Sequence, residues 1–244
     1  EAGSSEADGF TRIPKQSELD LDPNAAYLHL TSNNTIKGTQ YHQFPDSGQV
    51  PLVADMSSDF LWRPFDANRF HLIYAGAQKN IGPAGVTLVV IRKSWLEKAN
   101  EGLPTMLSYA TYSAKESLYN TPPVFAIYMV RNVLQWVKDR GGLEAMEKIN
   151  RAKGDRLYGV MTAHPDFYRC PVEPASRSYM NVVFRLPNED LEAKFVAEAK
   201  AAGMVGLKGH RSVGGCRASI YNAMPSEGVE RLAEFMESFA ANNG

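Results

Sequence analysis

The chain has 244 residues, 44% of them hydrophobic, which is enough to bury a core in one large domain or two smaller ones. Its 26 basic and 27 acidic residues leave a formal net charge of −1, and this balance argues against a nucleic-acid partner. No apolar stretch has the length of a membrane span, and no signal-peptide pattern opens the chain. We therefore expect a cytoplasmic protein without a membrane partner.

Two features bear on the compartment and on the extent of the chain. Cys170 and Cys216 lie in different segments without metal-ligand spacing, which predicts two free thiols and no metal site. The first residue is Glu1 rather than Met, and the stretch 1–9 has the character of the interior of a longer protein. We therefore expect a fragment of a longer protein or a truncated protein.

The first half of the chain predicts a sheet. After an irregular start with a short helix near 17–21, four apolar runs have the length and composition of strands. These runs cover residues 25–31, 49–55, 70–74 and 86–92. The turn before the last run is too short for a helical crossover, so this strand is expected to run antiparallel to its neighbour. The result is a mixed sheet that is mostly parallel.

Helices are expected to follow the sheet. A short helix over 94–99 leads into a loop that is expected to continue to Leu118. Residues 120–123 are typical of a helix start, with a polar cap before proline. Two long helices are then predicted, one over residues 124–137 and one from 143 to about 163, separated by Gly141-Gly142.

The pattern changes after these helices. Strands are predicted over 180–186, 204–208 and 217–222, with helices over 190–202 and 226–240. This order is typical of a small α+β domain. We therefore predict two domains, residues 1–142 with the mostly parallel sheet and residues 143–244.

Lys79 lies in a polar loop, Tyr74 to Gly85, between two predicted strands. Small residues on both sides would let the loop backbone approach a bulky group. A lysine in such a loop is most often simply exposed, but Asp55 ends the preceding strand, and the carboxyl ends of parallel strands meet at one crevice. An amine and a carboxylate placed there suit a pyridoxal phosphate enzyme, in which the lysine forms a Schiff base and the aspartate pairs with the pyridinium nitrogen.

A second candidate site is the segment from Lys208 to Arg217, which holds His210 and Arg211 among glycines. A basic surface hairpin explains this composition equally well. Arg217, however, begins an apolar strand, where an unpaired guanidinium is costly, so it is expected to bind an anion. Each hydrogen bond to a charged group contributes about 1.5–3 kcal/mol, and a carboxylate can accept two from arginine. The segment therefore predicts a small acidic substrate.

Four separated stretches resemble the phosphoserine aminotransferase family, whose members are fold type I pyridoxal phosphate enzymes. The stretches are residues 55–58, 74–85, 119–123 and 208–224, and they occur in the family's order. The similarity extends from about Tyr27 to the end of the chain. It implies an α/β fold type I transferase with a large cofactor-binding domain, of which residues 1–142 are the C-terminal portion, and a small C-terminal α+β domain.

The resemblance also implies roles at the cofactor. Lys79 matches the lysine that binds pyridoxal 5′-phosphate, and Asp55 matches the residue that pairs with its pyridinium nitrogen. Gln78 and Thr35 match residues that contact the ring and its hydroxyl region. No metal ion is implied.

Further matches imply a homodimer and an anionic substrate. Asn120 and Thr121 match residues that reach across a dimer to the neighbouring cofactor's phosphate, which would place the active sites at the subunit interface. Arg217 matches the residue that binds the substrate α-carboxylate. His210 and Arg211 match residues that help to hold the distal phosphate or carboxylate.

The family converts glutamate and 3-phosphohydroxypyruvate into 2-oxoglutarate and phosphoserine in a ping-pong cycle of serine biosynthesis, and the related 4-phosphohydroxythreonine reaction belongs to pyridoxine biosynthesis. Two alternatives stay open at this point. Another fold type I aminotransferase is one, because Lys79 and Asp55 alone do not select a substrate. The other is a truncated chain that binds a partner or an anionic ligand without catalysis. Family members begin well before the residue that matches Glu1, so the loop for the cofactor phosphate and the ring-stacking residue are not assigned.

Overall fold

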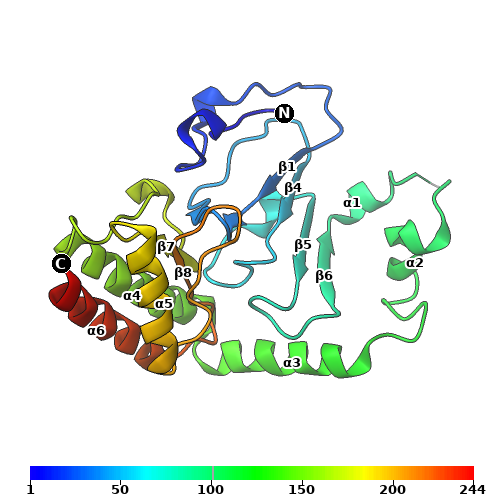
Figure 1. Cartoon of the computed structure of the whole chain (residues 1–244). Coiled ribbons are helices and arrows are strands. Elements are labelled where there is room, and N and C mark those ends of the chain that lie inside the picture. Colours follow the sequence, from blue (N-terminus) through cyan, green and yellow to red (C-terminus); the bar gives the residue numbers. More distant parts are fainter. Residues whose placement is uncertain (101) are drawn as a thin grey trace.

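A four-stranded sheet forms the centre of the first part of the chain in the computed structural model, which describes residues 1–100 and 102–244 (Figure 1). The strand order is β1-β4-β5-β6. The strands are β1 (Leu28–Thr31), β4 (Leu52–Asp55), β5 (Leu72–Gly76) and β6 (Thr87–Ile91). β1, β4 and β5 are parallel, and β6 runs antiparallel to β5. The predicted mixed sheet and its reversed last strand are therefore confirmed.

The register of the sheet brings the carboxyl ends of three strands to one edge. Thr31 at the end of β1 is paired with Asp55 at the end of β4, and Asp55 is paired with Tyr74 in β5. A small hairpin, β2 (Asn33–Asn34) and β3 (Thr39–Gln40), follows β1 at this edge. The hairpin leads from the sheet edge toward the C-terminal part.

The helices after the sheet differ from expectation in one region. They are α1 (Lys93–Leu96), α2 (Tyr109–Ser113), α3 (Val124–Asp139) and α4 (Gly142–Ala163). The loop expected up to Leu118 is wrong because it contains α2, whose five residues are too few for helical periodicity to show in the sequence. The expected polar cap of α3 is also wrong, because its N-cap is Pro123, which has no side-chain donor or acceptor.

Short 3-10 helices complete the irregular segments. They cover Glu6–Asp8, Gln16–Glu18, Ala67–Arg69, Thr105–Leu107 and Pro174–Ser176. The second of these stands where a short helix was expected near 17–21. Within the described residues, no helix combines the length and the apolar character that crossing a bilayer would require.

The C-terminal part packs three helices against two strands. α4 and α6 (Ser226–Asn243) lie with α5 (Glu189–Ala201) around the antiparallel pair β7 (Asn181–Phe184) and β8 (Cys216–Ser219) (Figure 1). The strand expected over 204–208 is wrong, because only Lys208 forms an isolated bridge, with Cys216. Gly203 and Gly206 adopt φ of 85° and 80°, and these left-handed conformations interrupt an extended chain.

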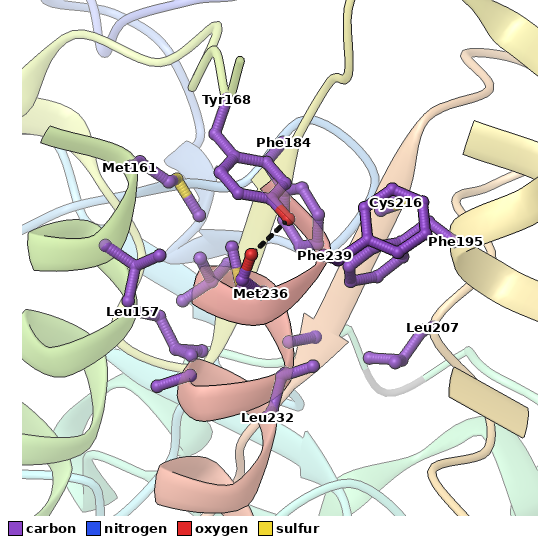
Figure 2. Packing of buried hydrophobic residues seen from close by; sticks show 14 of the residues in the cluster. Leu157, Met161, Tyr168, Phe184, Phe195, Leu207, Cys216, Leu232, Met236 and Phe239 are labelled. Carbon is purple, nitrogen blue, oxygen red and sulfur yellow. Dashed lines mark hydrogen bonds between the residues drawn. The ribbon is translucent and has the colours of Figure 1, made fainter. Parts of the chain in front are cut away.

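Two separate clusters of buried apolar side chains form the core. One surrounds the sheet and includes Leu52 and Ile73. The other fills the C-terminal part, where Tyr168 packs edge-on against Phe184 and Phe195 and donates its hydroxyl to the Met236 carbonyl at 2.8 Å (Figure 2). The clusters share no member, which supports the domain division at residues 142 and 143, although that boundary stays a prediction.

Buried amide and hydroxyl groups join the two parts at the β2–β3 hairpin. Asn33 donates to Asn181 Oδ1 at 2.8 Å and accepts the Ser178 hydroxyl at 2.5 Å. Gly38 has φ of 77°, and a Cβ on it would lie 2.6 Å from Val183 Cγ2, so only glycine lets the hairpin lie this close to β7. The hairpin therefore connects the carboxyl edge of the first sheet directly to the second.

A buried lysine, Lys153, donates hydrogen bonds to the turn that follows β8. Lys153 on α4 is 2% exposed, and its ammonium donates to the carbonyls of Ile220, Tyr221 and Met224 at 3.0, 2.8 and 3.1 Å. Burial lowers the pKa of Lys153 to about 8, so the amine remains mostly charged at pH 7. The three carbonyls replace the water that this charge loses.

We predict that Lys153→Met lowers the free energy of unfolding by about 3 kcal/mol or more, because it leaves three buried carbonyls without a donor. Urea denaturation followed by circular dichroism measures the change. Lys148→Met, at an exposed position of the same helix, is the control and is expected to stay within about 0.5 kcal/mol of the parent. Equal stabilities of the two variants would show that the three carbonyls do not depend on Lys153.

Candidate active site

The first candidate site lies where β4 and β5 end. Asp55 is half-buried, and its Oδ1 accepts the N–H of Ser57 at 2.8 Å. The Ser57 hydroxyl in turn accepts the N–H of Gly76, the last residue of β5, at 3.0 Å. This chain of hydrogen bonds holds the Asp55 carboxylate at the junction of the two strand ends.

The Lys79 loop leaves β5 as a tight turn. The N–H groups of Ile81 and Gly82 both donate to the Ala77 carbonyl, at 3.1 and 2.8 Å, and Lys79 is half-buried between them and the strand. A Cβ on Gly82 would lie 2.7 Å from Val130 Cγ2 on α3. A small residue was expected to let this loop approach a bulky group. At Gly82 that group is α3, which packs directly on the loop because glycine has no Cβ.

Gln78 precedes Lys79 in the loop, and Thr35 lies in the β2–β3 hairpin. Gln78 is exposed, and its amide folds back over Gly76, where an added Cβ would lie 2.9 Å from Gln78 Oε1. Thr35 is half-buried in the β2–β3 hairpin, and its carbonyl accepts Arg217 Nη1 at 2.9 Å. This hydrogen bond links the first site to the basic segment near β8.

A buried carboxyl group, that of Asp59, is linked to Asp55 through Ser32 and was not expected from the sequence. Asp59 is 5% exposed, contacts the Ser32 hydroxyl and accepts Gln40 Nε2 at 3.0 Å. Ser32 Oγ also lies 3.1 Å from the Asp55 carbonyl, and one hydroxyl proton cannot serve both acceptors. Burial raises the pKa of Asp59 to about 6. A protonated Asp59 satisfies all of these groups, because it donates to Ser32, which then donates to Asp55.

The second candidate site is a cavity of about 200 Å³ next to β7 and β8. Basic side chains from four segments line it together with apolar ones, and no acidic residue is among the lining residues. The basic residues are Lys37, Arg169, Arg185, Arg217 and His210. A cavity with this excess of positive charge favours an anion.

The cations of this cavity differ in how they are paired. Arg185 forms an ion pair with Glu192 at 2.5 Å. Lys37 lies 5.3 Å from the centre of the Phe10 ring. Arg217 binds only the Thr35 carbonyl among the described residues, and its Nε is buried without a hydrogen-bond partner. Arg217 therefore differs from the other lining cations in having a buried donor, Nε, that no described residue uses.

The remaining predicted residues lie elsewhere. Arg211 is exposed and does not line the cavity. Asn120 and Thr121 are exposed just before α3, where Asn120 Nδ2 donates to the Thr121 carbonyl at 3.1 Å. The structure thus brings His210 and Arg217 together in the cavity and Asp55 and Lys79 together at adjacent strand ends. Lys37 and Arg169 were missed because their segments show no pattern that points to a ligand.

Comparison with known proteins identifies the class of this fold. The model of the aminotransferase class-V family matches residues 5–232. The chain belongs to this family, and the predicted α/β fold is confirmed.

Several of the most similar relatives and solved structures are phosphoserine aminotransferases. The phosphoserine aminotransferase of Desulfosudis oleivorans is 59% identical over 244 residues, which are 100% of this chain and 67% of the relative. The solved phosphoserine aminotransferase of Bacillus circulans subsp. alkalophilus is 55% identical with a TM-score of 0.98, covering 100% of this chain and 67% of that one.

A solved PLP-bound phosphoserine aminotransferase from Trichomonas vaginalis is 37% identical with a TM-score of 0.88, covering 97% of this chain and 65% of that one. The chain therefore spans about two thirds of the length of these relatives.

We predict that the stability of the protein falls as the pH rises from about 4 to about 6. The pKa of folded Asp59, about 6, lies above the ordinary value of 3.8, so the folded chain holds this proton more tightly than the unfolded chain. The stability from this group is complete below pH 4 and is lost as the pH rises through 6, by about 3 kcal/mol for roughly two pKa units.

Asp59→Asn tests the assignment, because an amide mimics the protonated acid: its oxygen can accept Gln40 and its N–H can donate to Ser32. Denaturation at pH 4.5, 5.5 and 7 is expected to show a shallower pH dependence and at least parental stability at pH 7. An unchanged slope would assign the pH dependence to another group.

Proposed function

We propose that this chain carries the lysine, the ring-nitrogen partner and the carboxylate binder of a phosphoserine aminotransferase. Its reaction would transfer the amino group of glutamate to 3-phosphohydroxypyruvate, giving 2-oxoglutarate and phosphoserine in serine biosynthesis. The observation that carries this proposal is the 59% identity to a phosphoserine aminotransferase over the whole chain. The position of Lys79 and Asp55 at adjacent strand ends supports it. We also propose the 4-phosphohydroxythreonine reaction of pyridoxine biosynthesis and a cytoplasmic location, both from the family resemblance.

The residues at the strand ends fit pyridoxal 5′-phosphate as the cofactor. Lys79 supplies an amine that can attach to the cofactor's carbonyl carbon, and Asp55 supplies a carboxylate for its ring nitrogen. The Asp55 carboxylate is already oriented by the Ser57 N–H, so it needs no rearrangement to meet a cation. Gln78 and Thr35 are the proposed contacts for the ring and its hydroxyl. When bound, the cofactor accepts the electrons that are left on the substrate α-carbon after its proton is removed.

The side chains of Lys79 and Asp55 handle the protons of the reaction. Lys79 Nζ, once displaced by the substrate amine, takes the proton from the substrate α-carbon and returns it to another carbon in the next step. Asp55 keeps the proton on the ring nitrogen. Both acidic substrates present the same α-carboxylate, so one set of binding groups serves both halves of the reaction.

The basic cavity supplies those groups. Arg217 has free donors and holds its guanidinium near the hairpin through the Thr35 carbonyl, so it is the proposed binder of the α-carboxylate. His210 lines the same cavity and, with Arg211, is proposed to hold the distal phosphate or carboxylate. Lys37 and Arg169 add positive charge without an acidic neighbour in the lining, which favours a substrate with two anionic groups.

The proposed homodimer is supported by apolar residues around α3. Several large apolar side chains are exposed on α3 and on the segment before it. Exposed apolar side chains that gather in one patch usually mark an interface. They include Leu107, Leu118, Tyr119, Val124, Phe125 and Tyr128. Asn120 and Thr121 lie between Tyr119 and Val124 of this surface. If a second copy bound there, Asn120 and Thr121 of one copy would approach the cofactor site of the other.

We predict that Lys79→Ala reduces transamination by about 1,000-fold or more, because it removes both the covalent attachment and the general base. Visible absorption spectra recorded with added pyridoxal phosphate, before and after glutamate, are expected to lack the band of the lysine-bound cofactor. Lys93→Ala, at an exposed position, is the control with a parental spectrum. Retained turnover in Lys79→Ala would refute the proposed role.

We predict that Arg217→Gln raises KM about 10- to 100-fold for both glutamate and the phosphorylated keto acid, since a charged hydrogen bond worth about 1.5–3 kcal/mol is lost at a carboxylate present in each. Steady-state kinetics in both directions measure the effect. Arg231→Gln, an exposed arginine, is the control. A KM change for only one substrate would remove Arg217 from the shared α-carboxylate site.

We predict that Phe125→Asp shifts the protein from dimer to monomer in sedimentation velocity. Phe125 is 73% exposed on α3, and a buried charge at the interface would oppose association. Val205→Asp is the matched control, because Val205 is 75% exposed in the C-terminal part. A parent that is monomeric and fully active would contradict the homodimer.

A further inference from the structure

Asn80 follows the proposed catalytic lysine and is anchored on two sides. It is 8% exposed. Its Nδ2 donates to the Phe60 carbonyl at 2.7 Å, and its Oδ1 accepts the backbone N–H of Asn222 at 2.9 Å. Asn80 therefore connects the Lys79 loop both to the segment after β4 and to the turn after β8.

The peptide group that Asn80 binds is held from its other side by a buried cation. The N–H of Asn222 and the carbonyl of Tyr221 belong to the same peptide group. Lys153 Nζ donates to that carbonyl at 2.8 Å, while Asn80 accepts that N–H at 2.9 Å. A charge at one end of a hydrogen-bonded chain polarises the bonds that follow, and the interior strengthens each of them. The peptide group is thus fixed between α4 and the lysine loop.

Further amide groups hold the segment that contains Phe60, the second partner of Asn80. The Asn222 side chain donates to the Leu61 carbonyl at 3.0 Å, and Asn150 donates to the Trp62 carbonyl at 3.1 Å and to Asn222 Oδ1 at 2.8 Å. Leu61 adopts φ of 62°, a conformation that a branched side chain rarely takes without such support. The carbonyls of residues 60–62 therefore all accept hydrogen bonds from this network, and the Phe60 carbonyl accepts from Asn80 Nδ2.

Within residues 77–85, Asn80 is the residue whose side chain makes hydrogen bonds in the described structure. The turn itself rests on the Ala77 carbonyl and on the contact of Gly82 with α3. These contacts hold the start and end of the turn, while Asn80 fixes its centre, one residue from Lys79.

We propose that Asn80 is a positioning residue for Lys79, which aims the lysine amine by binding the Tyr221–Asn222 peptide group and the Phe60 carbonyl. This inference rests on the proposed function of Lys79. It adds that the geometry of the lysine depends on the C-terminal part of the chain, more than 130 residues away, through Asn222. Loss of Asn80 leaves Lys79 present but displaced.

The test compares Asn80→Ala with Tyr168→Phe in the protein. Each change removes buried hydrogen bonding, but the Tyr168 hydroxyl binds Met236 in the C-terminal core and does not touch the lysine loop (Figure 2). Both variants are expected to lose stability. Asn80→Ser, which keeps a hydroxyl at the site, replaces the alanine variant if that one does not fold.

Two readouts do not require turnover. The first is the rate at which pyridoxal phosphate followed by borohydride labels Lys79, located by peptide mass mapping. The second is amide hydrogen exchange over residues 77–82. Asn80→Ala is expected to slow Lys79 labelling at least 10-fold and to speed exchange of the loop at least 10-fold, while Tyr168→Phe stays within twofold of the parent in both. In turnover, kcat is expected to fall about 10-fold with KM for glutamate within twofold.

Parental labelling and parental kcat in Asn80→Ala, with stability lowered as in Tyr168→Phe, would overturn the positioning role. A parent whose label maps to lysines other than Lys79 would refute the proposed function instead. In that case the exchange measurement alone still reports whether Asn80 holds the loop, so the two failures are distinguishable.

Discussion

The two parts of this protein are joined by buried amides that must be satisfied. Asn33 with Asn181, and Asn80 with the Asn222 peptide, pair groups that would each cost free energy if left alone in the interior. Apolar packing tolerates small displacements, but an amide pair has one productive geometry. The relative position of the sheet edge and the β7–β8 pair is therefore set by hydrogen bonds, and both candidate sites lie at this junction.

This arrangement explains why the site draws on distant segments. The strand ends supply Asp55 and the Lys79 loop, while the proposed anion-binding groups come from the hairpin after β1 and from the neighbourhood of β8. The hydrogen bond from Arg217 to the Thr35 carbonyl is the direct link between them. A substrate with two charged ends and an amine suits such a site. The cationic cavity and the lysine proposed to react come from different segments of the chain.

Much of the fold follows from local pattern. Apolar runs of strand length, a turn too short for a crossover and glycine stops predicted the mixed sheet and the long helices. The positions of Asp55 and Lys79 at or after predicted strand ends singled out these two residues. The predictions were wrong where the signal was short or interrupted: α2 has five residues, and glycines at 203 and 206 break the run that was read as a strand. The roles of the site residues and the domain boundary stay predictions.

The sequence by itself determined most of the elements, the family and the residues at the strand ends, because these depend on neighbours within a few positions and on motifs that the chain carries. Only the tertiary structure decided which polar groups meet in the interior. Asn80 and Asn222 are 142 positions apart, and Asn33 and Asn181 are 148 apart. The buried Asp59, the hydrogen bond from Arg217 to the Thr35 carbonyl and the cationic cavity likewise arise from groups that become neighbours only on folding. No periodicity along a chain encodes which distant amide or carboxyl group will face another.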